Sequence, residues 1–315
     1  MSLKILFLGT APLARASLEA LLRWPQGSVA AVVTQPDRPK GRDLKLQPSA
    51  VKMAALAAGL PVWQPEKARD PGFIGQVRGL QPDLIVVAAY GQILSQELLD
   101  IPRFGCLNVH TSLLPKYRGA APIQWAILDG QEQTGVTIMK MDAGLDTGAI
   151  LAQLATAIRP EDDAGSLHDR LALLGAELLT ETIPPYVGGK ITALPQDPAH
   201  ASHARKITKE DGRLDWTQPA RMLWNRVRGL TPWPGTFTHA TLGGQPALLK
   251  IWRAAVEESG RSAPGEILRA DKGGVVVACG GQALRIEELQ REGGRKMAAA
   301  DFLAGHPLPV GAKLG

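Results

Sequence analysis

The chain has 315 residues, of which 45% are hydrophobic and 21% are charged, and its net charge is +5. This composition is that of a globular protein and excludes a disordered chain, a collagen and a long coiled coil. No apolar run approaches the roughly 18 residues of a transmembrane helix, and the N-terminus lacks the cleavage site of a signal peptide. The two cysteines, Cys106 and Cys279, form no CxxC pair, so we expect a cytoplasmic protein without a zinc ribbon or disulfide framework.

The first two thirds of the chain alternate between strand-like and helix-like segments. Apolar runs predict strands at Lys4–Gly9, Val29–Thr34, Asp83–Ala89, Cys106–His110 and Gly135–Met141. Helical spacing of apolar residues predicts helices at Ala11–Trp24, Val51–Leu60, Phe73–Leu80, Ala121–Leu128 and Ser166–Thr182. This alternation predicts a doubly wound, Rossmann-like α/β sheet.

A proline-rich stretch, Ile183–Arg205, ends that pattern and is typical of a linker. Short apolar runs separated by glycines follow it, at Gly235–Leu242, Ala247–Ala255, Gly265–Ala270, Val275–Cys279 and Ala283–Glu287. Such a series predicts a small antiparallel barrel or sandwich. We therefore expect a first domain at residues 1–188, a linker at 189–206 and a second domain at 207–315.

The positive charge is unevenly distributed along the chain. Residues 1–204 hold 18 Lys and Arg against 19 Asp and Glu, which is −1, whereas residues 205–315 hold 17 against 11, which is +6. A basic domain beside a neutral one suggests a polyanionic partner. A solvated basic surface without a partner would give the same count.

A long connection follows the second expected strand and is itself basic. It carries four cations, Arg38, Lys40, Arg42 and Lys45, against two carboxylates. Ligands of α/β folds bind at the carboxyl ends of the strands, where this loop lies, and long loops within compact domains are often functional. We interpret the four cations as phosphate-gripping residues. The alternative is a mobile, solvated loop.

Asn108 and His110 end another expected strand and share one of its faces, because strand side chains alternate. Polar residues are costly to bury at such a place without a use. A glycine-containing loop with Asp146 follows the next strand, so the three side chains are expected to meet in one cleft. Together they suit an acyl transfer without a covalent nucleophile, with His110 as proton shuttle, Asn108 as oxyanion donor and Asp146 as orienting carboxylate. A structural histidine and a turn-capping aspartate are the alternatives.

Other chemistries find less support. The turn after the first strand has only the first glycine of G-x-G-x-x-G, which disfavours a nicotinamide-dependent dehydrogenase. The remaining histidines are scattered and no metal-ligand spacing is present, so no metal site is expected. The sequence also lacks a nucleophile elbow, a phosphate-binding Walker loop and a kinase signature.

Two segments, NVHTSLLPKYRGAAPIQWAI and GVTIMKMDAGLDTGAIL, resemble the folate-dependent formyltransferases. The stretches VVTQPDRPKGRDLKLQPSAVK, KEDGRLDW and NRVRGLTPWPGTF resemble the branch of that family that acts on aminoacylated tRNA. The resemblance covers nearly the whole chain, although residues 290–315 match poorly. It implies a Rossmann-like catalytic domain followed by an OB-like barrel that contacts tRNA.

The resemblance also implies substrates and residue roles. The donor would be 10-formyl-tetrahydrofolate and the acceptor the α-amino group of methionyl initiator tRNA, in a monomeric enzyme of translation initiation without a metal or a membrane. Asn108, His110 and Asp146 match the catalytic positions, and Arg42 matches a basic loop near the tRNA acceptor end. The matching folate-contacting residues are Ser112, Leu113, Leu114 and Pro115, with Ile93 and Leu94 beside the pterin pocket.

Three rival functions remain. A formyltransferase acting on glycinamide ribonucleotide would match only the first ~200 residues. One acting on an amino-sugar nucleotide can carry a second domain, and only the basic loop argues against it. A non-catalytic RNA-binding protein would leave Asn108, His110 and Asp146 unexplained.

Overall fold

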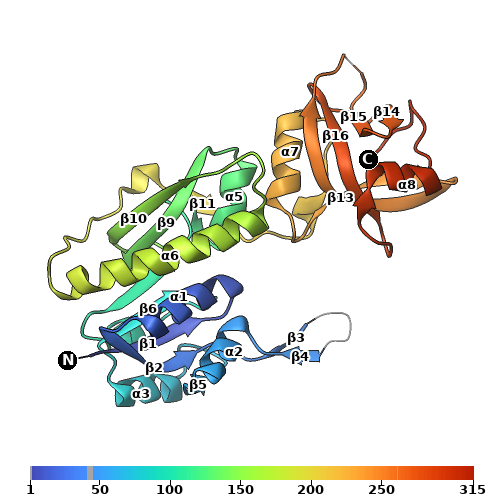
Figure 1. Ribbon diagram of the computed structural model, residues 1–315. Helices are drawn as coiled ribbons and strands as arrows, with labels where there is room; N and C mark the ends of the chain where they lie inside the picture. The colour runs from blue at the N-terminus through green and yellow to red at the C-terminus, as the bar shows by residue number, and fades with distance from the viewer. Residues whose placement is uncertain (1, 41–44, 261) are drawn as a thin grey trace. The chain divides into compact units, whose positions relative to one another are not determined.

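The computed structural model describes residues 2–40, 45–260 and 262–315 (Figure 1). The chain divides into two compact units, and each is described by itself. The first unit comprises Met1–Pro122, Gln133–Ala157 and His168–Arg205, and the second comprises Ile123–Glu132, Ile158–Leu167 and Lys206–Gly315. No helix of the described residues is both long enough and apolar enough to cross a membrane.

A seven-stranded sheet forms the centre of the first unit. Its order is β10-β9-β7-β6-β1-β2-β5. The strands are β1 (Leu3–Gly9), β2 (Gly27–Val33), β5 (Val62–Trp63), β6 (Leu84–Ala88), β7 (Cys106–His110), β9 (Gln133–Lys140) and β10 (Ile150–Ala157). Strands β5, β2, β1, β6 and β7 are parallel, whereas β9 runs antiparallel to both β7 and β10. The expected doubly wound α/β sheet is thus confirmed.

Helices cover both faces of this sheet. They are α1 (Pro12–Arg23), α2 (Ala50–Ala57), α3 (Pro71–Leu80), α4 (Gln96–Leu99) and α6 (Ala164–Val187). Alternate strand residues, such as Leu6 and Val87, form a buried cluster with Phe73 of α3 and Leu98 of α4. The opposite face is covered by α1 and α6, which Figure 1 shows in front of the strands.

Helix α6 is longer than expected. The sequence predicts its end at Thr182, but the helix continues to Val187 and contains Pro184 and Pro185. A proline removes one backbone donor and clashes with the carbonyl four residues earlier. Both prolines lie within the last four residues of the helix, so few helical hydrogen bonds are lost.

Two short pairs of strands accompany the main sheet. Strands β3 (Arg38–Lys40) and β4 (Lys45–Gln47) form an antiparallel hairpin within the basic connection. Strands β8 (Arg118–Gly119) and β11 (His203–Ala204) pair in parallel. The second pair joins the segment after β7 to the proline-rich stretch, so that stretch makes ordered contacts with the first unit.

The second unit is built on an antiparallel sheet of six strands. The strand order is β12-β13-β16-β15-β14, and β17 pairs with β16. The strands are β12 (Thr236–Leu242), β13 (Gln245–Glu257), β14 (Ile267–Asp271), β15 (Gly274–Ala278), β16 (Ala283–Arg291) and β17 (Met297–Ala298). Helices α5 (Pro122–Leu128), α7 (Ala220–Gly229) and α8 (Ala299–Gly305) complete the described helices of this part of the chain. Its core joins Leu223 and Val227 of α7 and Phe302 of α8 to inward-facing strand residues. The expected antiparallel β domain is confirmed.

Candidate active site

Asn108 and His110 lie at the carboxyl end of β7, in the interior of the sheet. Asn108 is in register with Val87 of β6 on one side and Met139 of β9 on the other, and His110 is in register with Thr137. The His110 side chain is only 6% exposed, whereas Asn108 is half-buried. The strand therefore presents an amide and an imidazole on one face, as the alternation of side chains requires.

Asp146 approaches both side chains from the loop between β9 and β10. Its Oδ1 accepts a hydrogen bond from Asn108 Nδ2 at 3.4 Å, and its Oδ2 lies 3.7 Å from His110 Nδ1. The backbone N–H of Gly119 donates to Oδ2 at 2.8 Å. Asp146 has a positive φ of 52°, a left-handed conformation that aspartate adopts more readily than most residues. The structure thus brings together the three side chains that sequence reasoning grouped.

The two ring nitrogens of His110 have different partners. Nε2 lies 2.9 Å from the backbone carbonyl oxygen of Tyr117. A carbonyl oxygen only accepts, so Nε2 carries a proton and donates it to this bond. In the neutral ring, Nδ1 is then the unprotonated nitrogen, and it faces the Asp146 carboxylate. A proton taken up at Nδ1 would therefore lie beside the Asp146 carboxylate.

A glutamine from the proline-rich stretch supports the loop that carries Asp146. Gln196 Nε2 donates to the backbone oxygens of Asp146 at 2.8 Å and Gly148 at 2.7 Å. Its Oε1 accepts from Arg118 Nε at 3.0 Å and from a second guanidinium nitrogen at 2.7 Å. Arg118 is buried, so this bidentate contact fixes Gln196 in place.

The segment after His110 is rigidly held. Ser112 is fully buried, and its Oγ donates to the backbone oxygen of Lys116 at 2.6 Å. The side chain of Thr137 accepts from the backbone N–H of Leu114 and donates to the backbone oxygen of Ser112. Leu114 is 3% exposed, while Leu113 and Pro115 are half-buried. Of these four candidate folate residues, Leu113 and Pro115 thus have the more accessible side chains.

The other two candidate folate residues, Ile93 and Leu94, differ sharply in exposure to solvent. Ile93 is 83% exposed, an unusual state for a large aliphatic side chain, whereas Leu94 is 4% exposed and belongs to the core beneath the sheet. Ile93 is therefore free to contact a ligand, and Leu94 anchors the turn that presents it.

The candidate phosphate-binding residues lie on the β3–β4 hairpin, and Arg38 is exposed. The backbones of Lys40 and Lys45 are paired across the hairpin. Arg42 lies outside the described residues.

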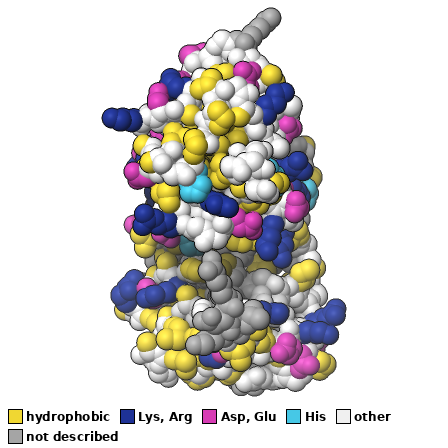
Figure 2. All heavy atoms as spheres, turned by 90° about the vertical axis from the view of Figure 1, so that its right-hand side faces the viewer, with side chains coloured by type: hydrophobic (Ala, Val, Ile, Leu, Met, Phe, Trp, Pro, Cys, Tyr) yellow, Lys and Arg dark blue, Asp and Glu magenta, His cyan; other side chains and the backbone are white. Residues whose placement is uncertain are grey.

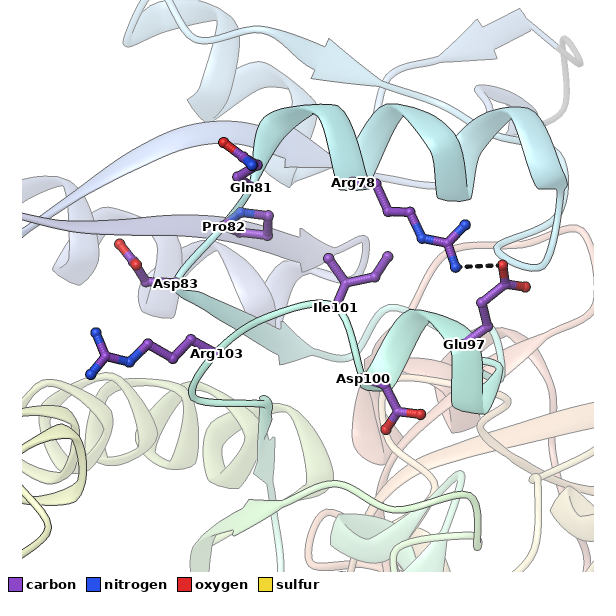
Figure 3. A pocket seen from close by; sticks show the side chains of 8 residues that line it. All are labelled: Arg78, Gln81, Pro82, Asp83, Glu97, Asp100, Ile101 and Arg103. Atoms are coloured by element: carbon purple, nitrogen blue, oxygen red, sulfur yellow. Dashed lines mark hydrogen bonds and ion pairs between the residues drawn. The ribbon is translucent and has the colours of Figure 1, made fainter.

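One cavity of the described residues lies away from this chemistry. It measures about 620 Å³ and opens beside Asp83, which precedes β6, and thus at the amino ends of the parallel strands. Figure 3 shows the ion pair of Arg78 with Glu97, at 2.7 Å, among its lining side chains. None of the candidate site residues lines it, and a mixed set of paired cations and carboxylates selects no ligand.

Sequence reasoning missed four groups at the site: Tyr117, Arg118, Gln196 and the N–H of Gly119. Tyr117 and Gly119 act through backbone atoms, which leave no side-chain signal in a sequence. Gln196 lies 50 residues beyond Asp146, in a stretch that reads as a linker. Arg118 alone had a signal, as a cation within a proline- and glycine-rich loop beside the candidate histidine.

Comparison with known proteins identifies the family of the chain. The formyl transferase family model matches residues 3–183, and the model of the formyl transferase C-terminal domain matches residues 206–307. A methionyl-tRNA formyltransferase of Geobacter metallireducens is 51% identical over 314 residues, which are 99% of each chain. The enzyme of that name from Thiobacillus denitrificans is 49% identical over 313 residues, 99% of this chain and all of that one.

Solved structures share the fold at lower identity. HypX from Aquifex aeolicus in complex with tetrahydrofolic acid has a TM-score of 0.61 and 18% identity, over 96% of this chain and 47% of that one. The N-formyltransferase from Helicobacter canadensis, solved with folinic acid and dTDP-3-aminofucose, has a TM-score of 0.63 and 18% identity, over 90% and 98% of the two chains. With both domain models matched and relatives half identical along their full length, the chain belongs to the formyl transferase family.

Proposed function

We propose that the protein transfers the formyl group of 10-formyl-tetrahydrofolate to the α-amino group of methionyl initiator tRNA, for translation initiation. The observation that carries this proposal is the 51% identity to a methionyl-tRNA formyltransferase over 99% of both chains. The cluster of Asn108, His110 and Asp146 supplies the chemistry that such a transfer needs.

The transfer needs an oxygen polarised, an amine deprotonated and a leaving nitrogen protonated. The Asn108 amide can donate to the oxygen of the formyl group, where negative charge develops as the amine attacks. His110 can take a proton at Nδ1 because Nε2 is already bound to the Tyr117 carbonyl. Asp146 stabilises the resulting cation from 3.7 Å and holds the Asn108 amide in place.

Folate binding is assigned to the surface beside this cluster. Leu113 and Pro115 offer apolar contact, while Ser112 and Leu114 hold the segment in shape through buried contacts. The exposed Ile93 adds an apolar contact from the turn that Leu94 anchors. The donor supplies the formyl group, and these residues bind and orient it.

Phosphate contacts are assigned to Arg38, Lys40, Arg42 and Lys45 of the basic connection and to cations of residues 205–315. The second unit as a whole holds 17 Lys and Arg against 16 Asp and Glu, because it also includes the acidic segments Ile123–Glu132 and Ile158–Leu167. Much of the charge on the sheet of that unit is internally balanced, because Arg253, Arg269, Arg285 and Lys296 pair with four carboxylates. On the face that Figure 2 shows, cations and carboxylates are interspersed. The excess of +6 in residues 205–315 therefore rests on cations outside this network, which are the candidates for contact with tRNA.

The proposal also covers the domain boundaries, the cellular location and the oligomeric state. Residues 1–188 form the catalytic domain, 189–206 connect it, and 207–315 form an OB-like domain that contacts tRNA. The enzyme acts as a cytoplasmic monomer.

The test is formyl transfer in parallel reactions. Purified protein is mixed with 10-formyl-tetrahydrofolate and either methionyl initiator tRNA or an amino-sugar nucleotide. Formylation of the tRNA alone supports the proposal, and transfer to the sugar alone overturns it while leaving the Asn108, His110 and Asp146 site intact. An Arg42→Ala variant should formylate tRNA less efficiently, while its binding of folate stays unchanged.

A further inference from the structure

Three polar side chains form a closed cluster at the base of the basic hairpin. Lys52 Nζ donates to Asp37 Oδ2 at 2.6 Å and to Gln64 Oε1 at 2.7 Å. Gln64 Nε2 donates to Asp37 Oδ1 at 2.9 Å. Each side chain thus binds both of the others, and those of Lys52 and Asp37 are 20% and 26% exposed. None of the three was singled out from the sequence.

This cluster, Asp37–Lys52–Gln64, connects the hairpin to the ends of the central strands. Gln64 Nε2 also donates to the backbone oxygen of Gln35 at 2.9 Å. Gln35 Nε2 in turn donates to the backbone oxygen of Tyr90, just after β6, at 2.9 Å. Gln35, three residues before β3, is therefore tied to the carboxyl edge of the sheet, where β7 also ends.

The returning end of the hairpin is held at the same place. Ser49 follows β4 and caps α2, since its Oγ accepts from the backbone N–H of Lys52 at 3.0 Å. The Ser49 hydroxyl also lies 2.8 Å from that of Thr34, at the end of β2, and both are buried. Lys52 of α2 then reaches across to Asp37. Both ends of the hairpin are consequently anchored to one another and to the sheet.

The charge of Asp37 is otherwise hard to explain beside a phosphate-binding loop. The hydrogen bonds from Lys52 and Gln64 lower the pKa of Asp37, so it is ionised at neutral pH. A carboxylate next to Arg38 opposes the approach of a polyanion. The Asp37 carboxylate is explained if it holds the hairpin in position.

We propose that Asp37, Lys52 and Gln64 are positioning residues that fix the basic hairpin for tRNA. This inference rests on the proposed function of the hairpin. A free hairpin would lose conformational entropy on binding, whereas an anchored one has already lost it. Loss of the cluster should therefore weaken tRNA binding without touching the reacting groups.

The Asp37→Ala variant distinguishes a positioning role of Asp37 from an effect of its charge alone, because the two roles change the KM for tRNA in opposite directions. If only charge mattered, removal of a carboxylate would lower the KM for tRNA. The positioning role predicts a KM for tRNA that rises about fivefold to tenfold, with kcat and the KM for 10-formyl-tetrahydrofolate within twofold of wild type. The matched control is Glu66→Ala, which removes an exposed carboxylate of the same unit and should leave the KM for tRNA unchanged or slightly lower.

The Lys52→Met variant tests the same cluster by removing the cation that pairs with Asp37. Its KM for tRNA should rise as in Asp37→Ala, and the double variant should be little worse than either single one, because all of them break one network. Lys67→Met is the matched control, since Lys67 is exposed and its side chain makes no hydrogen bond or ion pair among the described residues. Additive losses in the double variant would contradict the proposal.

Limited trypsin digestion gives a readout without tRNA. Cleavage after Lys40, Arg42 and Lys45 of the basic connection should be at least fivefold faster in Asp37→Ala and Lys52→Met than in the wild type and both controls, at equal thermal stability. Arg38 is no site, because Pro39 follows it and trypsin does not cleave before proline. If wild-type protein formylates the tRNA but Asp37→Ala has an unchanged or lower KM, the positioning role fails alone. If wild-type protein does not formylate the tRNA, the proposed function fails, and digestion still decides whether the cluster anchors the hairpin.

Discussion

The carboxylate of Asp146 faces Nδ1 of His110 at 3.7 Å, while the other ring nitrogen is bound to the Tyr117 carbonyl at 2.9 Å. This arrangement fixes the tautomer of the neutral ring and leaves one nitrogen for proton transfer. The 3.7 Å separation is longer than a hydrogen bond, so a proton on Nδ1 remains available to a reacting group. This geometry supports the proposed role of His110 in proton exchange, since the ring is not locked into a permanent ion pair.

Replacement of His110 should abolish most of the chemistry. General acid–base catalysis contributes roughly 10²–10⁴-fold, and His110→Ala should lower kcat by that order. His110→Gln can still donate to the Tyr117 carbonyl but cannot exchange a proton, so it should be equally slow. The measurement is single-turnover formyl transfer, with tRNA affinity determined separately as the control. A near-wild-type rate in either variant would exclude His110 as the proton-transfer group.

Asp146→Asn should keep the volume of the side chain and remove its charge. Its single oxygen can still accept from the N–H of Gly119, but its NH2 group then faces the Nδ2 donor of Asn108, and no carboxylate is left to stabilise a cationic His110. We expect kcat to fall by at least ~10²-fold, with the KM values of both substrates changed by less than about threefold. Thermal unfolding provides the control for integrity. If Asp146→Asn kept wild-type kcat, the carboxylate would be a loop cap and no more.

Sequence patterns predicted the central sheet and most of its helices, because buried strands and amphipathic helices leave periodic apolar signals. Strand β10 was not predicted, since it is the edge strand and six of its eight residues are exposed or half-buried in succession. Helix α7 was not predicted either; its ten residues include three arginines and an asparagine. Its apolar residues Ala220, Leu223, Trp224 and Val227 nevertheless stand at the i, i+3, i+4 and i+7 spacing of an amphipathic helix. The signal was therefore present in the sequence and was overlooked, and this face of α7 packs against β13 and β16.

The candidate site was predictable in its side chains but not in its supports. Asn108 and Asp146 do meet, at 3.4 Å, but not through strand ends that share one edge. Strand β9 runs antiparallel to β7, so the loop between β9 and β10, rather than the end of the strand, brings Asp146 to Asn108. Gln196 and Lys52 act through contacts that are remote in sequence or between polar residues, for which no periodicity exists. Such partners are defined only once the chain has folded.

Gln196→Ala tests the support of the catalytic loop. The variant loses two hydrogen bonds to the backbone of the Asp146 loop and leaves the buried Arg118 without its acceptor. We expect kcat to fall about tenfold with both KM values nearly unchanged, because Asp146 loses its position and the binding surfaces do not. Gln133→Ala, at an exposed position of β9, is the matched control. A rise in KM at constant kcat would contradict this role.

Both cysteines should be chemically silent in the folded protein. Burial raises the pKa of Cys106 to about 12 and that of Cys279 to about 11 from 9.0. The thiolate is the reactive form, so iodoacetamide at pH 8 should modify neither residue until the chain is unfolded. Because the folded state holds these protons more tightly, the free energy of unfolding should fall as the pH rises above ~9. Mass spectrometry of native and denatured samples measures the labelling, and rapid native labelling of Cys106 would contradict its burial.

Two glycine substitutions should have opposite effects on stability. Gly75 is exposed within α3, and a Cβ there meets nothing within 4 Å, so Gly75→Ala should stabilise the protein by ~0.5–1 kcal/mol through lower entropy of the unfolded chain. At Gly148, beside Asp146, a Cβ would overlap the backbone oxygen of Lys140, so Gly148→Ala must displace the loop and should lower both Tm and kcat. Thermal unfolding and single-turnover kinetics of the two variants measure the contrast. If Gly148→Ala kept the Tm and kcat of Gly75→Ala, the loop of Asp146 would tolerate movement. The claim that Gln196 supports catalysis by holding this loop in position would then fail as well.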